Sequence, residues 1–247
     1  MASLRCAGLA RRLPLPQLRL AASVPEPSEL EQRAPRPTGW WSRFVQFSYH
    51  WLGDSLYHKK ADICNCGGDF GVTLPRSELL QRAGIEKGTY EHRMQLYGGA
   101  LYWHMATNIT ERFKDAQPSM LRDKDVLEVA CMRGGGARYL AEVAQPRWYL
   151  AVDHVQSHID RCRENFGEWP GLEFEVMDAH DLARKLPAES FDYVLCIQAA
   201  ASFEHVAEFV AGTHHVLRKG GRLLLADALQ RNRNAQLLDA LEARPYS

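Results

Sequence analysis

The sequence has little that marks a membrane-spanning, nucleic-acid-binding or disulfide-rich protein. It contains no apolar run of about 18 residues or more, so we predict no transmembrane helix. Lysine plus arginine number 30, and so do aspartate plus glutamate, so no overall basic field predicts a nucleic-acid partner. Six cysteines are scattered over 247 residues, which favours a reducing compartment over a disulfide framework.

Metal-ligand patterns are also scarce. Cys64 and Cys66 are close enough for a metal or redox pair, but a zinc site needs further Cys or His ligands and no second pair lies nearby. We therefore interpret this stretch as a loop and predict no metal site.

Residues 1–37 begin with a stretch, residues 1–24, that contains four arginines, and no acidic residue precedes Glu26. An arginine-rich, acid-free and partly amphipathic start is typical of a transit peptide for a mitochondrion or another organelle. Pro14 and Pro16 interrupt any long helix there, so a leader without an address, on a cytoplasmic protein, fits equally well.

Aromatic residues are concentrated after this leader. Trp40, Phe44, Phe47 and Trp51 are four, three and four residues apart, which places them on one face of a helix. Such a helix either packs on its own domain, covers an apolar substrate, or makes peripheral contact with a membrane. Further on, YEHRMQLYGGALYWHMATNITERF predicts a helical region with a break at its glycine pair. We therefore treat residues 38–118 as a helical N-terminal extension.

From residue 119 to 247, strand-like and helix-like segments alternate with short loops. We expect strands at 125–130, 148–153, 172–178, 191–198 and 222–229, with helical segments between them and a last helix at 234–244. The glycines of KGG, residues 219–221, are expected to end the helix before the last strand. This alternation predicts a doubly wound parallel α/β sheet with helices on both faces.

Polar residues stand at the carboxyl ends of the expected strands, where ligands bind in open α/β sheets. Glu128, Asp153, Asp178 and Gln198 occupy these positions. Carboxylates suit the hydroxyls of a ribose, and Asp153 follows Glu128 by 25 residues, close to the spacing of a ribose-binding acid. Alternatively, the two aspartates cap the helices that follow, and the glutamine is a satisfied buried amide.

The turn after the first strand reads EVACMRGGG, from Glu128 to Gly136. A dinucleotide site needs G-x-G-x-x-G, and the frame that starts at Gly134 ends on Tyr139, which disfavours a nicotinamide cofactor and an oxidoreductase. S-adenosylmethionine has no phosphates. It needs a glycine turn, an acid for its ribose and a polar edge for its adenine.

The sequence from about residue 90 to 230 resembles the class I S-adenosylmethionine-dependent methyltransferases, of the methyltransferase type 11 kind. The stretches VLEVACMRGGGARYLAEV, YLAVDHVQSHIDRCREN, FEVMDAHDLARKLPAESFDYVLCIQAAASFEH and HHVLRKGGRLLLAD are similar to that family's motifs, in the same order. LPAESFDYV and MQLYGGALYWHMATN resemble most the phthiotriol- and tocopherol-type lipid methyltransferases.

The resemblance implies S-adenosylmethionine as the cofactor and assigns a role to each matching position. Glu128 would orient the turn, and Ala130 and Gly134 would lie along the cofactor. Asp153 would bind the ribose and His154 would lie against the adenine. The remaining positions are Asp178 with Ala179 at the adenine amino group, and Gln198 near the methionine end.

Three departures from the family pattern E-x-G-x-G-x-G and its surroundings favour an alternative. Ala130 and Met132 replace the first two glycines, and a methionine at positive φ costs about 1–2 kcal/mol. Alanines follow the fourth strand, so no catalytic base is identified and only Glu204 and His205 lie nearby. The family's last two strands are not apparent.

We therefore expect a methyltransferase that acts on a small or lipid-like acceptor, and keep open a catalytically inactive relative that serves as a binding or scaffold protein. The sequence predicts neither the acceptor nor the oligomeric state.

Overall fold

The structure, a computed structural model, describes residues 63, 74–81, 87–107, 119–227 and 231–243. The leader of residues 1–37, the aromatic stretch that begins at Trp40, and the pair Cys64 and Cys66 lie outside these ranges. The expectations for these segments stay predictions.

The described chain contains one five-stranded parallel sheet in the order β3-β2-β1-β4-β5. The strands are β1 Asp125–Val129, β2 Trp148–Asp153, β3 Leu172–Val176, β4 Phe191–Ile197 and β5 Leu217–Ala226. The α-helices are α3 Tyr90–Thr107, α4 Gly135–Val143, α5 Gln156–Phe166, α6 Leu182–Lys185, α7 Val206–Val216 and α8 Arg231–Glu242. Two short 3-10 helices are η2 Ala179–Asp181 and η3 Ala200–Ser202.

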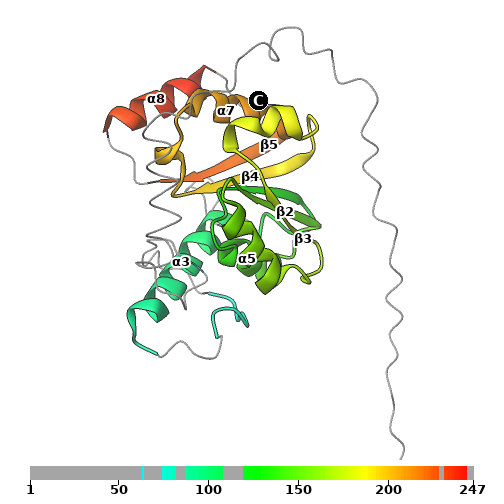
Figure 1. The fold of residues 1–247 in the computed structure, drawn as a ribbon, viewed down its shortest axis with the longest axis vertical. Coiled ribbons are helices and arrows are strands. Elements are labelled where there is room, and N and C mark those ends of the chain that lie inside the picture. The colour runs from blue at the N-terminus through cyan, green and yellow to red at the C-terminus, as the bar shows by residue number, and fades with distance from the viewer. Residues whose placement is uncertain (1–62, 64–73, 82–86, 108–118, 228–230, 244–247) are drawn as a thin grey trace, which may run out of the picture. The chain divides into compact units, whose positions relative to one another are not determined.

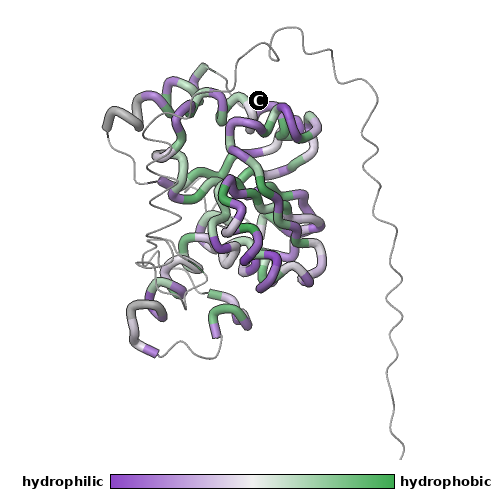
Figure 2. Tube along the Cα trace, in the orientation of Figure 1, coloured by the Kyte–Doolittle hydropathy of each residue, from purple (hydrophilic) through white to green (hydrophobic). Residues whose placement is uncertain are grey.

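Helices cover both faces of this sheet (Figure 1). Alternate strand residues point to opposite faces, so Val126 packs with α3, α4 and α5, while Leu127 packs with α6, α7 and α8. Every residue of β1 is buried, as expected for the central strand of a covered parallel sheet. Figure 2 shows the resulting pattern, with hydrophobic residues along the strands and hydrophilic ones distributed over the helices. The predicted doubly wound α/β fold is confirmed.

Two local predictions were wrong. Helix α3 continues through Gly98 and Gly99 without a break, because the bare backbone at Gly99 lies against Leu80. The KGG stretch does not end α7, which stops at Val216. The next residue is extended and starts β5, and Gly220, at φ 77°, lies inside that strand. In both cases tertiary packing, and not the local tendency of glycine to interrupt a helix or end it, determines where the glycine lies.

Helix α3 packs directly on the glycine-rich start of α4. The ring of Tyr102 lies so close to Gly136 that a Cβ there would come within 1.8 Å of Tyr102 Cζ. A second link lies further along α4, where Arg138 pairs with Glu142 at 2.8 Å and stacks on Trp169 at 3.3 Å. Glu142 in turn accepts hydrogen bonds from Ser77 Oγ at 2.9 Å and from the backbone N–H of Glu78 at 2.7 Å. The N-terminal segments therefore join the core of the sheet domain.

No helix among the described residues is long and apolar enough to span a membrane.

The contact at Gly136 yields a stability prediction. Gly136→Ala forces Tyr102 or α3 to move, and overpacking of this kind costs about 1–3 kcal/mol. We expect a lower midpoint of thermal unfolding, measured by circular dichroism. Gly99→Ala is the matched control, because its Cβ meets only the ends of flexible side chains, Leu80 at 3.1 Å and Ile63 at 3.9 Å, and alanine favours a helix interior. Equal midpoints for Gly136→Ala and the wild type would contradict the contact.

Candidate functional site

The turn between β1 and α4, residues 130–134, has an alternating left-handed backbone. Ala130, Met132 and Gly134 have φ values of 63°, 51° and 73°. These are the three positions at which the motif E-x-G-x-G-x-G places glycine. The chain therefore keeps the glycine backbone conformation with alanine and methionine in two of the three places, at a cost of about 1–2 kcal/mol for each. We call residues 130–134 the β1–α4 turn.

Gly134 is the one position of this turn where a side chain has no room. A Cβ there would lie 2.7 Å from Cys162 Sγ and 2.8 Å from Phe174 Cε1. Cys162, from α5, also donates a hydrogen bond from its thiol to the carbonyl of Met132 at 3.3 Å. The floor of the turn is thus formed by α5 and β3, which explains why glycine remains at this position.

Asp153, at the end of β2, holds the turn from the other side. Its Oδ2 accepts the backbone N–H of Met132 at 2.9 Å, and its Oδ1 accepts that of Val155 at 2.9 Å and contacts His158 Nδ1 at 3.2 Å. Burial raises the pKa of this carboxyl, but the hydrogen bonds from His158 and Val155, with the charge of His154, outweigh burial and hold the pKa below its usual range. Asp153 is therefore an ionised anchor of the β1–α4 turn.

Glu128 lies at the foot of the turn and is 1% exposed. Tyr102 of α3 donates its phenol hydrogen to Oε1 at 2.6 Å, and Tyr149 of β2 donates to Oε2 at 2.8 Å. Burial raises the pKa of Glu128 to about 7, although both phenols lower it. Glu128 was predicted to orient the turn. In the structure it connects β1 to α3 and β2 through these two buried hydrogen bonds.

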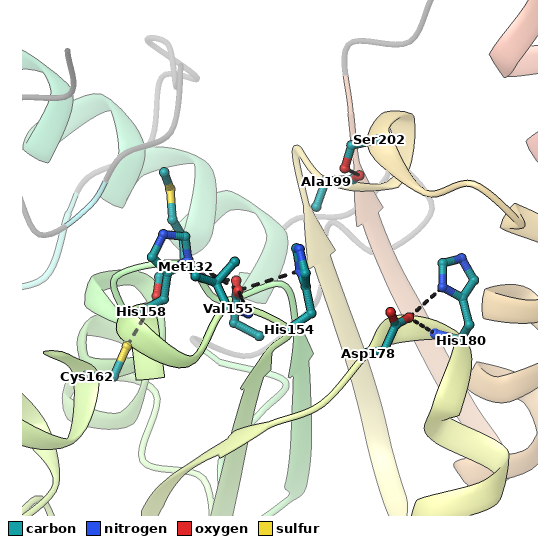
Figure 3. A network of polar contacts seen from close by, with 10 residues as sticks. Met132, His154, Val155, His158, Cys162, Asp178, His180, Ala199 and Ser202 are labelled. Atoms are coloured by element: carbon teal, nitrogen blue, oxygen red, sulfur yellow. Dashed lines mark hydrogen bonds and ion pairs between the residues drawn. The ribbon is translucent and has the colours of Figure 1, made fainter. Parts of the chain in front are cut away.

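Asp178 follows β3 and forms the other side of the site (Figure 3). Its Oδ1 accepts the backbone N–H of His180 at 2.8 Å and lies 2.5 Å from His180 Nδ1. Burial raises the pKa of Asp178, but the contacts with His180 lower it to about 2. His180 Nε2 accepts the backbone N–H of His205 at 3.2 Å, so Nδ1 carries the proton of a neutral ring. Both ring nitrogens are then engaged.

The remaining predicted residues surround these acids. His154 is exposed, with Nδ1 3.8 Å from Asp153 Oδ1, and Ala179 is buried. Gln198 follows the last residue of β4 in the left-handed region, at φ 55°, and its backbone N–H donates to the carbonyl of Ala226 at 2.7 Å. Glu204 and His205 are exposed. Among the described residues, no group of acidic, histidine or cysteine side chains is arranged to hold a metal ion.

The structure thus brings most of the predicted residues to one end of the sheet. Figure 3 shows Met132, His154 and His158 near the ends of β1 and β2, Asp178 and His180 after β3, and Ala199 and Ser202 after β4. The alternative capping role is present for Asp178, which is the N-cap of η2 and accepts the backbone N–H of His180, whereas Asp153 accepts the N–H of Val155, just before α5, and is not the cap of that helix. These hydrogen bonds use part of each carboxylate, which has about four acceptor positions, and so do not exclude a ligand.

Sequence reasoning missed four contributors: Tyr102, Tyr149, His158 and His180. The two histidines follow the aspartates by five and two residues, and this short spacing was the available signal. Tyr102 lies 26 residues before the acid that it contacts, so no local pattern indicates that pair.

Comparisons with known proteins agree with this geometry. Residues 127–225 match the family model described as a methyltransferase domain. The phthiotriol/phenolphthiotriol dimycocerosates methyltransferase of Mycobacterium tuberculosis is 38% identical over 125 residues, which are 51% of this chain and 45% of that protein. The fatty-acid O-methyltransferase of Mycolicibacterium smegmatis is 39% identical over 108 residues, 44% of this chain and 38% of that protein. The chain thus spans less than half the length of these relatives.

Solved structures also match parts of the chain. The phosphoethanolamine N-methyltransferase 1 of Haemonchus contortus, in complex with phosphoethanolamine and S-adenosylhomocysteine, is 25% identical. The match covers 42% of this chain and 22% of that one, with a TM-score of 0.39. An S-adenosylmethionine-dependent methyltransferase from Mesorhizobium loti is 24% identical, over 42% and 46% of the two chains, with a TM-score of 0.38.

With its motifs in order and its strands in the sequence β3-β2-β1-β4-β5, the chain contains a methyltransferase domain, matched over residues 127–225.

Proposed function

We propose that this chain transfers a methyl group from S-adenosylmethionine to a lipid-like acceptor. The observation that carries the proposal is the β1–α4 turn, which keeps left-handed backbone at Ala130, Met132 and Gly134. Left-handed residues are costly for side chains other than glycine and persist where the surrounding structure determines them. Here the surroundings are Asp153 on one side and Cys162 on the other.

The residues around the turn fit the cofactor's chemistry. Asp153 Oδ2 accepts one backbone N–H and has a second acceptor position for a ribose hydroxyl. The Asp178 side chain is 48% exposed and ionised, with capacity to accept from an adenine amino group. His154, directly after Asp153, is exposed. The family resemblance implies that its ring would lie against the adenine.

The chain's own contribution to the reaction is positioning. When bound, S-adenosylmethionine supplies an electrophilic methyl group on a sulfonium. Asp153 and Asp178 would fix the cofactor at the ends of β2 and β3. Transfer of the methyl group then requires mainly that the acceptor oxygen is aligned with the bond between the methyl group and the sulfur. His180 is not placed as a general base, because Nδ1 faces Asp178 and Nε2 accepts from the backbone of His205.

The lipid-like acceptor is inferred from the relatives. Phthiotriol dimycocerosates and fatty acids are named in proteins 38% and 39% identical to this chain, and both are long apolar molecules with an oxygen to methylate. Because the matches cover 45% and 38% of those proteins, the acceptor class is a proposal for this chain.

The alternative of a catalytically inactive relative gains no support. The matched relatives are named as methyltransferases. The replacement of two glycines, which first suggested degeneration, leaves the turn's backbone in the left-handed conformation.

Cofactor binding can be tested by calorimetric titration with S-adenosylmethionine. We expect the native chain to bind. Met132→Gly and Ala130→Gly both relieve left-handed strain and should each raise stability by about 1 kcal/mol. Ala130→Gly removes only a methyl group, so a gain in affinity confined to Met132→Gly would assign the effect to the methionine side chain. No binding heat with any of the three proteins would contradict the proposal.

Asp178 offers a second binding test. Asp178→Ala removes a charged acceptor, and a lost hydrogen bond to a charged group is worth about 1.5–3 kcal/mol, so affinity for S-adenosylmethionine should fall roughly tenfold or more. Asp181→Ala is the control, since this neighbouring acid pairs instead with Arg184 at 2.8 Å. If both variants bind like the wild type, Asp178 does not contact the cofactor.

The acceptor class can be tested with methyl-labelled S-adenosylmethionine and three acceptors: a long-chain fatty acid, a long-chain diol and the small diphenol catechol. We expect label to enter one of the long-chain acceptors and not catechol. Transfer to catechol alone would overturn the lipid-like acceptor. Cofactor binding without transfer to any of the three would contradict the proposed activity on long-chain acids and diols.

A further inference from the structure

We propose that Tyr102, on a helix outside the matched domain, is a positioning residue that holds the Glu128 carboxyl beneath the β1–α4 turn through its hydroxyl, so that cofactor binding depends on the docking of α3. This inference rests on the proposed function, because it concerns the same cofactor site. The family match, which covers residues 127–225, does not include Tyr102, and no role was assigned to this residue from the sequence.

Tyr102 makes two separate contacts around the turn. Its hydroxyl donates to Glu128 Oε1 at 2.6 Å, just before the turn, and its ring lies on Gly136, just after it. The residue is 4% exposed, so both contacts are shielded from water. Helix α3 therefore fixes both ends of the turn through a single side chain, and the ring position ensures that the hydroxyl reaches the carboxylate.

The carboxylate of Glu128 depends on these phenols for its charge. It is 1% exposed and receives one phenol on each oxygen, from Tyr102 and from Tyr149. The titratable groups that face it come from four elements. They are Tyr102 of α3, Tyr149 and Asp153 of β2, Cys131 of the turn and Cys196 of β4.

Burial and the negative charge of Asp153 raise the pKa of Glu128, the two phenols lower it, and the balance of these effects is a pKa of about 7. Loss of the Tyr102 hydroxyl removes one of the two lowering contributions, so the pKa of Glu128 rises and the acid becomes neutral near pH 7.

The charge of Glu128 matters for a cationic ligand. S-adenosylmethionine carries a sulfonium, whereas its demethylated product S-adenosylhomocysteine carries a neutral thioether. A buried negative charge at the foot of the turn stabilises the first more than the second, because buried charges are weakly screened. The ionised acid therefore favours binding of the methyl donor over the product.

Tyr102→Phe tests this directly, because it keeps the ring on Gly136 and removes only the hydroxyl. At pH 7 we expect affinity for S-adenosylmethionine, measured by calorimetry, to fall about tenfold, the scale of one hydrogen bond to a charged group. Affinity for S-adenosylhomocysteine should fall less. As pH rises above 7, a growing fraction of Glu128 ionises even without this hydroxyl, so the ratio of the variant's affinity to that of the wild type should recover.

Tyr97→Phe is the matched control, with the same substitution on the same helix at a side chain that is 43% exposed. It should change neither ligand's affinity. An equal loss for both ligands at every pH in Tyr102→Phe would reduce Tyr102 to a packing residue and overturn the inference.

A titration without ligand separates failure of this inference from failure of the proposed function. Below its ordinary value of 4.5, Glu128 is protonated in folded and unfolded chains alike. Between 4.5 and about 7 only the unfolded chain ionises, so the free energy of unfolding falls as pH rises through this window. In Tyr102→Phe the fall should extend to higher pH than in the wild type and Tyr97→Phe.

A wild-type chain that binds neither ligand would overturn the proposed function and, with it, the role of Tyr102 in cofactor binding. The ligand-free titration would then decide whether the hydroxyl holds the charge of Glu128. Identical pH profiles for Tyr102→Phe and the wild type would overturn that link even if the cofactor binds.

Discussion

The Asp153 carboxylate joins the end of β2 to the β1–α4 turn, and the conformation of the candidate cofactor site depends on this connection. One oxygen accepts the backbone N–H of Met132, which stands in the left-handed region, and the other accepts that of Val155. A backbone held in this way keeps a conformation that its side chains disfavour, since a hydrogen bond to a charged group is worth more than the strain of one residue. The turn's geometry is therefore set by a charge on the neighbouring strand and not by glycine content.

The same turn is held from three further directions. Cys162 of α5 and Phe174 of β3 fill the space under Gly134, and Tyr102 of α3 bridges Glu128 and Gly136. The different surroundings of Glu128 and Asp178 shift the pKa values of these two acids in opposite directions. Glu128 is buried with neutral phenol partners and has a raised pKa, whereas Asp178, half-exposed beside His180, has a lowered one. A site built in this way has one acid, Asp178, that stays ionised and one, Glu128, whose charge depends on the packing of the N-terminal helix.

The fold could be predicted from the sequence because its signals are local. Each strand is a short apolar run, each connection is short, and a parallel sheet follows from the alternation. The positions of the acids at strand ends follow from the same pattern, and the positive φ of Met132 follows from the motif register. The continuity of α3 at Gly99 and the early start of β5 could not be predicted, because they depend on Leu80 and on pairing with β4. The link from Tyr102 to Glu128 is likewise a tertiary contact without a local signature.

The measurement that tests the account most directly is a crystal structure of the chain grown with S-adenosylhomocysteine. The account predicts the ligand along residues 130–134, with its ribose at Asp153, its adenine at Asp178, and Met132 still at positive φ. A ligand bound elsewhere, or a turn whose Met132 has moved to negative φ, would contradict the claim that this strained turn is the cofactor site.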